Sequence, residues 1–209
     1  MTGQLDVPPV VVKLGGSFAF SEDLTDWIRA LASCASSVVI VPGGGPFADA
    51  VRHAQGRMRF HDRAAHDMSL LAMEQYGHAL ISFNDTLSAA DTIEAIERRL
   101  AARQVPVWMP MRMVAAAADI APSWKVTSDS LAAWLCGRIG ADRLILVKHV
   151  GALSGTVRCE DLVTMGLLDE AFPRYLQMSS ISASILGPGD HAVAAAAIRC
   201  GASARVSIK

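Results

Sequence analysis

The fold class is decided by PVVVKLGGS, residues 9–17, together with the similar stretch SVVIVPGGGP, residues 37–46. Each is a short run of apolar, mostly β-branched residues that ends in glycines, a pattern typical of a strand buried on both faces and followed by a tight turn. Helical patterns follow them over residues 22–35 and 46–55. This alternation of strand and helix indicates a mostly parallel sheet with helices on both faces.

The alternation continues along the rest of the chain. Further helices are predicted over residues 63–79, 88–103, 128–139 and 190–200. Further strands are predicted at residues 105–108, 144–147, 182–186 and 204–208. No repeat or low-complexity linker divides the sequence. We therefore expect residues 1–209 to form a single α/β domain, a three-layer α/β/α sandwich with a mostly parallel central sheet.

Composition excludes several classes of protein. Hydrophobic residues make up 52% of the 209 residues and charged residues 19%, which supports a large core and excludes global disorder. The 19 basic and 20 acidic side chains nearly cancel, which argues against a nucleic-acid partner or an anionic membrane surface. No apolar run reaches the ~20 residues that span a bilayer, and the pattern of a signal peptide is absent.

The cysteines show neither a CxxC pair nor metal-finger spacing. They are Cys34, Cys136, Cys159 and Cys200. We expect all of them to be buried or half-buried free thiols in a reducing cytoplasm.

Two lysines lie where parallel strands are predicted to end. Lys13 and Lys148 are two of only four lysines in the chain, and each follows a run of apolar residues. A buried ammonium is costly unless an anion neutralises it, and neighbouring glycines let backbone N–H groups approach a phosphate. Ligands of such sheets bind at the carboxyl ends of the strands, so we expect a phosphate site there. The alternative is that the glycines only make turns and the lysines extend to solvent.

The glycine loop after the second strand leaves another class of protein open. The GxxxxGK[ST] pattern is absent, which excludes a P-loop nucleotide hydrolase. However, GGGPFA at residues 43–48 satisfies G-x-G-x-x-[G/A], and Asp62 lies near the position of a ribose-binding acid. A dinucleotide-binding oxidoreductase therefore remains an alternative, although it leaves Lys13 and Lys148 without a role.

Asp129 lies in the first turn of the helix predicted from Ser128. The helix dipole favours an acid at this place, so helix capping alone would explain it. Beside a phosphate site, the same carboxylate can instead orient lysines through hydrogen-bonded ion pairs. Asp62 and His66 have a spacing that could ligate a metal, but they lack a third partner, and no protein metal site is expected.

Four segments in order resemble the amino acid kinase superfamily, and the resemblance covers nearly the whole chain. They are KLGGS, VPGGGP, TSDSLAAWL and GADRLILVK. Within the superfamily, Trp124 and residues 47–52, 62–66 and 71–77 are similar to the kinases linked to methanofuran biosynthesis, which phosphorylate (aminomethyl)furanmethanol phosphate to its diphosphate. The resemblance implies a cytoplasmic, ATP-dependent kinase of a small phosphorylated acceptor that forms a homo-oligomer.

The resemblance also implies roles by position. Lys13 would contact the transferred phosphoryl group, and Asp129 would orient this lysine. The nucleotide phosphates would be held by Gly15, Gly16 and Ser17. The phosphate side of the acceptor would be held by Gly43, Gly44 and Gly45. Apart from the resemblance, we expect His66 to face that phosphate, and the alternative is a histidine with a structural role only. Mg²⁺ would arrive with ATP and keep mostly water and phosphate ligands.

Two departures from relatives bear on the nucleotide. The loop from Lys148 to Ala152 reads KHVGA, whereas many relatives have a Thr-Asp-Val-Asp-Gly type of loop there. His191 stands near the place where many relatives have a second lysine. We expect Lys148 to replace that cation and contact the β- or γ-phosphate. The alternative is a nucleotide- or oxyanion-binding subunit with a degraded active site.

Overall fold

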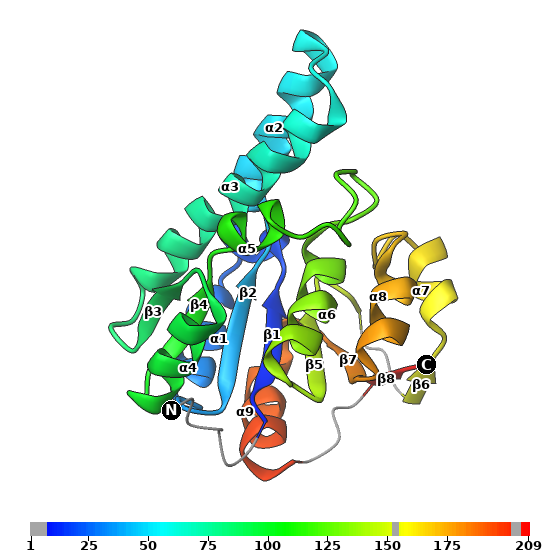
Figure 1. Cartoon of the computed structure of the whole chain (residues 1–209). Helices are drawn as coiled ribbons and strands as arrows, with labels where there is room; N and C mark the ends of the chain where they lie inside the picture. Colours follow the sequence, from blue (N-terminus) through cyan, green and yellow to red (C-terminus); the bar gives the residue numbers. More distant parts are fainter. Residues whose placement is uncertain (1–7, 152–154, 202–205) are drawn as a thin grey trace.

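The computed structural model describes residues 8–151, 155–201 and 206–209. Within them, the strands form one sheet in the order β3-β4-β2-β1-β5-β7-β8-β6 (Figure 1). The strands are β1 (Val10–Leu14), β2 (Val38–Pro42), β3 (Leu87–Ala90), β4 (Val105–Trp108), β5 (Arg143–Val147), β6 (Gly155–Val157), β7 (Ser182–Leu186) and β8 (Val206–Ile208). Neighbouring strands from β3 to β7 pair in parallel, and only the β7–β8 pair among the described strands is antiparallel. The expected mostly parallel sheet is confirmed.

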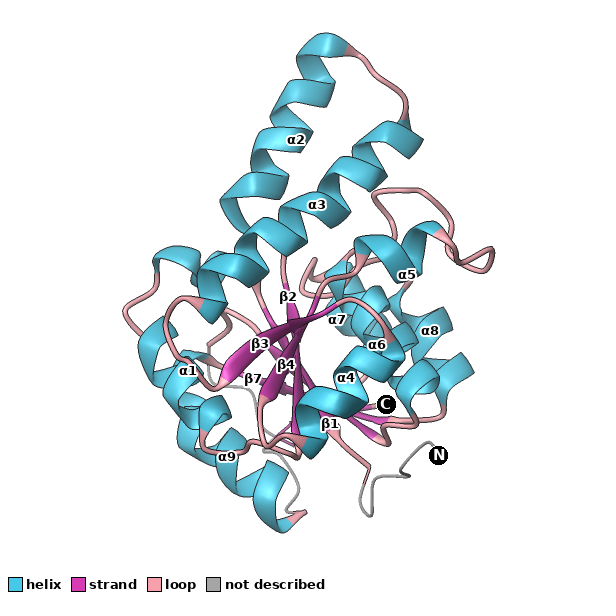
Figure 2. Cartoon of the chain, turned by 60° about the vertical axis from the view of Figure 1, so that its left-hand side comes forward, coloured by secondary structure: helices cyan, strands magenta, loops and turns pink. Residues whose placement is uncertain are grey.

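Helices cover both faces of this sheet (Figure 2). They are α1 (Leu24–Ala32), α2 (Gly45–Met58), α3 (Asp62–Ile81), α4 (Ile93–Ala101), α5 (Met111–Ala115), α6 (Ser128–Ile139), α7 (Cys159–Thr164), α8 (Phe172–Ser179) and α9 (His191–Cys200). Helices α1 and α9 share one core with the sheet, whereas α4, α6 and α8 share the other. The three-layer α/β/α architecture is therefore also confirmed.

Strand alternation decides which way the two lysines face. Val11 packs into the core on the α6 side of β1, and Lys13, two residues further on, faces the same side. On the adjacent strand β5, Leu144 and Leu146 pack into that core, and Lys148 continues the alternation. Both ammonium groups consequently point toward the beginning of α6.

One predicted helix is wrong at its start. The helix expected over residues 88–103 is preceded by strand β3, which pairs in parallel with β4. Helix α4 begins only at Ile93, because the hydroxyl of Thr92 accepts a hydrogen bond from the N–H of Ala95 at 3.1 Å. Pairing with β4 overrides the helix propensity of the alanines in β3.

Other boundaries differ by a few residues. The first helix starts at Leu24 rather than after Ser21, since residues 16–20 form a separate 3-10 helix. The short elements β6, α5, α7 and α8 were not predicted as such. The last strand begins at Val206, and residues 204–205 of the expected strand lie outside the described residues.

The cysteines are free thiols, and three of them are buried, namely Cys34, Cys136 and Cys159. Cys200 is exposed at the end of α9, so the expectation of burial is wrong for this residue. In the described part of the chain, no helix is long and apolar enough to cross a bilayer.

Candidate active site

A buried carboxylate lies between two lysines at the carboxyl ends of the central strands. The Asp129 Oδ1 atom is 2.9 Å from the Nζ of Lys13, and Oδ2 accepts a hydrogen bond from the Nζ of Lys148 at 2.6 Å. The side chains of Lys13 and Asp129 are 5% and 4% exposed, whereas that of Lys148 is 16% exposed. The structure thus brings Lys13 together with two residues that lie more than 110 positions later in the sequence.

Burial and charge shift the ionisation of this cluster in opposite senses. Burial lowers the pKa of Lys13 to about 8, and the charge of Lys148 adds to this effect while Asp129 opposes it. Burial also disfavours ionisation of Asp129, but the two lysines outweigh it and hold its pKa below the ordinary value. One anion facing two cations leaves positive charge in a place with little water, which favours binding of a further anion.

The two glycine loops are in direct backbone contact. A Cβ atom on Gly16 would lie 2.2 Å from the backbone nitrogen of Gly45, and one on Gly43 would lie 2.3 Å from that of Gly16. Gly45 also has a positive φ of 55°, which disfavours a side chain. Gly15 is held differently, because its N–H donates to the carbonyl of Val147 at 3.2 Å.

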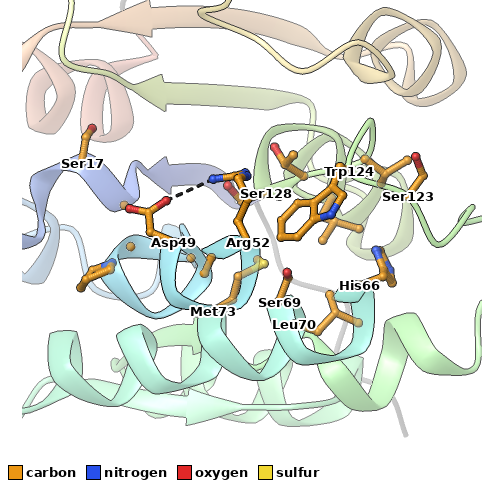
Figure 3. Close-up of a pocket in the computed structure, with 18 of the residues that line it drawn as sticks. Ser17, Asp49, Arg52, His66, Ser69, Leu70, Met73, Ser123, Trp124 and Ser128 are labelled. Atoms are coloured by element: carbon orange, nitrogen blue, oxygen red, sulfur yellow. Dashed lines mark hydrogen bonds and ion pairs between the residues drawn. The ribbon is translucent and has the colours of Figure 1, made fainter. Parts of the chain in front are cut away.

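A pocket of about 390 Å³ opens beside these loops, between α2, α3 and the segment that precedes α6 (Figure 3). The loops contribute Gly16, Ser17, Gly44 and Gly45 to its wall. Helix α3 contributes His66, Ser69, Leu70 and Met73. The first N–H groups of α2 lack intrahelical acceptors, and the N-cap residue Gly44 has no side chain to satisfy them. This end of the pocket is therefore suited to an anionic group.

Trp124 joins the pocket wall to α2 (Figure 3). Its indole N–H donates to the Oε1 of Gln55 at 2.6 Å, and the guanidinium carbon of Arg52 lies 4.5 Å from the centre of its ring. Arg52 also pairs with Asp49 at 3.1 Å. The pocket consequently has an aromatic surface with an arginine beside it, a combination that the sequence analysis did not predict.

His66 lies in the pocket wall, and its contact with an acceptor phosphate remains a prediction. It is 8% exposed, and burial lowers its pKa from the ordinary value. Asp62, one turn earlier, is instead engaged by Gln55, whose amide nitrogen donates to Oδ1 at 2.9 Å.

Helix capping does not explain Asp129. Its carboxylate is occupied by the two lysines, and the N-cap position of α6 belongs to Thr127. The first turn is capped instead by Asp169, from the loop between α7 and α8, which accepts hydrogen bonds from the N–H groups of Thr127 and Ser130 at 2.9 and 3.1 Å. Sequence reasoning missed Asp169, because no local pattern links it to a helix that begins about 40 residues earlier.

The nucleotide loop is only partly described, since Ala152 lies outside the described residues. The ring of His149 packs against Phe18 with 4.7 Å between the centroids. His191 packs edge-on against Trp27 at 6.4 Å. Lys148 does not extend freely into solvent, because Asp129 holds its ammonium; its contact with a phosphate remains a prediction.

The geometry does not support the dinucleotide-binding alternative. In that class the ribose-binding acid lies close to the glycine loop. Here Asp62 begins α3, and the 14-residue helix α2 separates it from the glycine loop by roughly 21 Å along its axis.

The central strands of this sheet end in glycine loops and paired lysines, an arrangement suited to binding phosphate groups. The model of the amino acid kinase family matches residues 8–155, and the chain belongs to this family. Members of the family are ATP-dependent kinases of small molecules.

Individual relatives share only a small part of their sequence with this chain. The chain is 24% identical over 189 residues to [5-(aminomethyl)furan-3-yl]methyl phosphate kinase of Methanocaldococcus jannaschii, which covers 84% of this chain and 86% of that protein. The structure is similar to uridylate kinase of Archaeoglobus fulgidus, with a TM-score of 0.73, 19% identity and coverage of 96% of this chain and 100% of the other. UMP kinase of Ureaplasma parvum gives a TM-score of 0.71 at 13% identity, with 97% and 99% coverage. The two structural matches support the fold.

Proposed function

We propose that the chain transfers the γ-phosphoryl group of ATP to a small acceptor that already carries a phosphate. The observation that carries this proposal is the buried cluster of Lys13, Asp129 and Lys148 next to a pocket with glycine loops at one end. The preferred acceptor is [5-(aminomethyl)furan-3-yl]methyl phosphate, the substrate named for the curated relative.

The cluster suits phosphoryl transfer. An oxygen of the acceptor phosphate attacks the γ-phosphorus, a new P–O bond forms, and the bond to the β-phosphate oxygen breaks to release ADP. The attacking phosphate oxygen is already ionised, so the protein needs no general base. Lys13 neutralises the transferred group, and Lys148 contacts the β- or γ-phosphate, because charge on the equatorial oxygens is what catalysis must stabilise.

The pocket suits the acceptor. Its phosphate would lie at the first turn of α2, near Gly45, with His66 in the opposite wall. The planar ring would lie against the indole of Trp124, which already has the guanidinium of Arg52 over its ring. Mg²⁺ enters with ATP as part of the nucleotide substrate.

The test is an assay of purified protein with Mg-ATP and [5-(aminomethyl)furan-3-yl]methyl phosphate. The reaction is monitored through the release of ADP and through the ³¹P NMR signals of the diphosphate product. UMP serves as a second acceptor, because uridylate kinases share the fold. Lys13→Met is the control, with kcat expected to fall about 10²-fold or more, the scale of one lost transition-state contact. If ADP is released with UMP but not with the furan phosphate, the proposed acceptor is wrong and the acceptor is a nucleotide.

A second candidate is a nucleotide-binding subunit without catalysis. The observation that favours it is the loop after β5, where His149 packs on Phe18 and the acid of many relatives is missing. Tight binding of Mg-ATP without ADP release, over a broad panel of phosphorylated acceptors, would support this candidate. Binding of NADH in place of ATP would contradict both.

A further inference from the structure

Asp169 fastens the first turn of α6 from a distant part of the chain. Its Oδ2 accepts hydrogen bonds from the N–H of Thr127 at 2.9 Å, the hydroxyl of Thr127 at 2.8 Å and the N–H of Ser130 at 3.1 Å. Its Oδ1 accepts a further hydrogen bond from the hydroxyl of Ser130. These donors lie on both sides of Asp129 in the sequence, so the carboxylate spans the turn that carries Asp129.

The neighbouring residues fasten the same two segments to each other. The N–H of Ala171 donates to the carbonyl of Lys125 at 3.1 Å, and the ammonium of Lys125 pairs with Glu170 at 2.8 Å. Residues 169–171 therefore hold the chain from Lys125 to Ser130, which runs from the pocket wall into α6. In Figure 1, α8 lies beside α6, in agreement with these contacts.

A local cap would satisfy the helix without bringing a second acid close to Asp129. Thr127 occupies the N-cap position, yet its side chain makes no capping bond and donates to Asp169 instead. Burial raises the pKa of Asp169, and the charge of Asp129 adds to this effect, while the hydrogen bonds from Ser130 and Thr127 oppose it. The arrangement thus places a half-buried carboxylate near the buried carboxylate of Asp129, a cost that ordinary capping does not require.

We propose that Asp169 is a positioning residue for phosphoryl transfer, which fixes the first turn of α6 so that Asp129 lies between Lys13 and Lys148. The proposal rests on the proposed function for its effect on turnover, but its effect on the lysines is independent of the acceptor. Alignment matters here, because a displacement of about 1 Å in a catalytic constellation costs roughly 10²-fold in rate.

Two variants separate the hydrogen bonds from the charge. Asp169→Ala removes all acceptors, whereas Asp169→Asn keeps an oxygen for the donors that now reach Oδ2 and turns an amide toward the Ser130 hydroxyl, which can accept. We expect Asp169→Ala to lower kcat roughly 10–10²-fold with little change in the KM for Mg-ATP. Asp169→Asn is expected to retain kcat within about threefold, since its hydrogen bonds remain.

A second readout needs no acceptor. Because the chain has only four lysines, their ¹³C-labelled ε-carbons can be assigned and titrated by NMR. Asp129 raises the pKa of Lys13, so its displacement in Asp169→Ala moves the titration midpoint of Lys13 to lower pH. This measurement tests Asp169 even if the wild-type protein phosphorylates none of the acceptors tried.

The matched control is Thr92→Ala, which removes the side-chain cap of α4 away from the pocket. It lowers the melting temperature, as the loss of a cap does, and leaves kcat and the Lys13 midpoint unchanged. If Asp169→Ala fails to fold, Ser130→Ala removes one donor and should shift the Lys13 midpoint in the same direction. Two results would overturn the proposal. In the first, Asp169→Ala keeps the kcat and the Lys13 titration midpoint of the wild-type protein. In the second, Asp169→Ala loses only stability, as Thr92→Ala does.

Discussion

Asp129 is the residue on which the candidate site depends. Two ammonium groups share its carboxylate, and the cluster keeps excess positive charge until an anion arrives. Removing the carboxylate differs from removing a surface partner, because it leaves two cations in a poorly hydrated place. Asp129 therefore both stabilises the apo protein and orients the lysines.

Asp129→Asn tests this double role. We expect kcat to collapse by about 10²-fold or more, since a neutral amide cannot pair with both lysines. Stability should also fall, in contrast to a simple cap, which Asn would replace at little cost. Measurements of the melting temperature and of kcat on the same variant test the two roles separately. An unchanged melting temperature would mean that the carboxylate of Asp129 is not needed to stabilise the two buried cations.

The pKa of Lys13 predicts an alkaline limit to activity. The protonated form neutralises phosphate, so kcat/KM for Mg-ATP should decline as the pH rises through about 8. Lys148 lowers this pKa through its charge, so Lys148→Met should move the decline to higher pH while reducing the plateau. The pH dependence of kcat/KM in the wild-type protein and in Lys148→Met checks the direction of this shift. A decline that moves to lower pH would contradict the placement of Lys148 beside Lys13.

At the scale of elements, the central strands β1, β2, β5 and β7 and the two lysines were predictable because local patterns define them. Apolar runs mark buried strands, and alternation along β1 and β5 places both lysines on the side of α6. The beginning of α4 was not predictable from alanine-rich residues, since pairing with β4 decides it. The contribution of Asp169 was not predictable either, because its partners lie about 40 residues away and only the packing of α8 on α6 brings them together.

The contact between the glycine loops predicts that a glycine-to-alanine substitution has opposite effects on stability at two positions, Gly16 and Gly56. Gly16→Ala would place a Cβ atom 2.2 Å from the nitrogen of Gly45, so the backbone must move and both stability and kcat should fall. Gly56→Ala adds a Cβ atom to α2 where nothing lies within 4 Å, and it should stabilise the helix by up to about 1 kcal/mol. Melting temperatures and turnover of the two variants give the comparison. Equal behaviour of the two would mean that the loops can separate freely.

At the scale of the whole molecule, helices α2 and α3 project from the sheet as a hairpin (Figures 1 and 2). The segment before α6 is attached to this hairpin through the bond between Trp124 and Gln55. The pocket lies between the hairpin and this segment, so its width depends on the contacts of Trp124 with Gln55 and Arg52 of α2.

Trp124→Phe keeps an aromatic ring but removes this hydrogen bond. We expect a several-fold higher KM for the acceptor with little change in that for Mg-ATP, since a lost hydrogen bond costs about 1 kcal/mol. Gln55→Met removes the same bond together with the bond from Gln55 to Asp62, so it should raise this KM at least as much, and adding Trp124→Phe to it should have little further effect. Additive losses in steady-state assays would show that the two side chains act separately.

The meeting of the glycine loops has a consequence for how such a protein changes its specificity. Backbone touches backbone between Gly16 and Gly45, so in the proposed reaction the spacing between the donor side and the acceptor side is set without any side chain. The far walls of the pocket, formed by residues such as Trp124, His66 and Met73, can be exchanged without altering that spacing. New acceptors can thus be accommodated by redesigning the walls, while the path along which the phosphoryl group travels keeps its length.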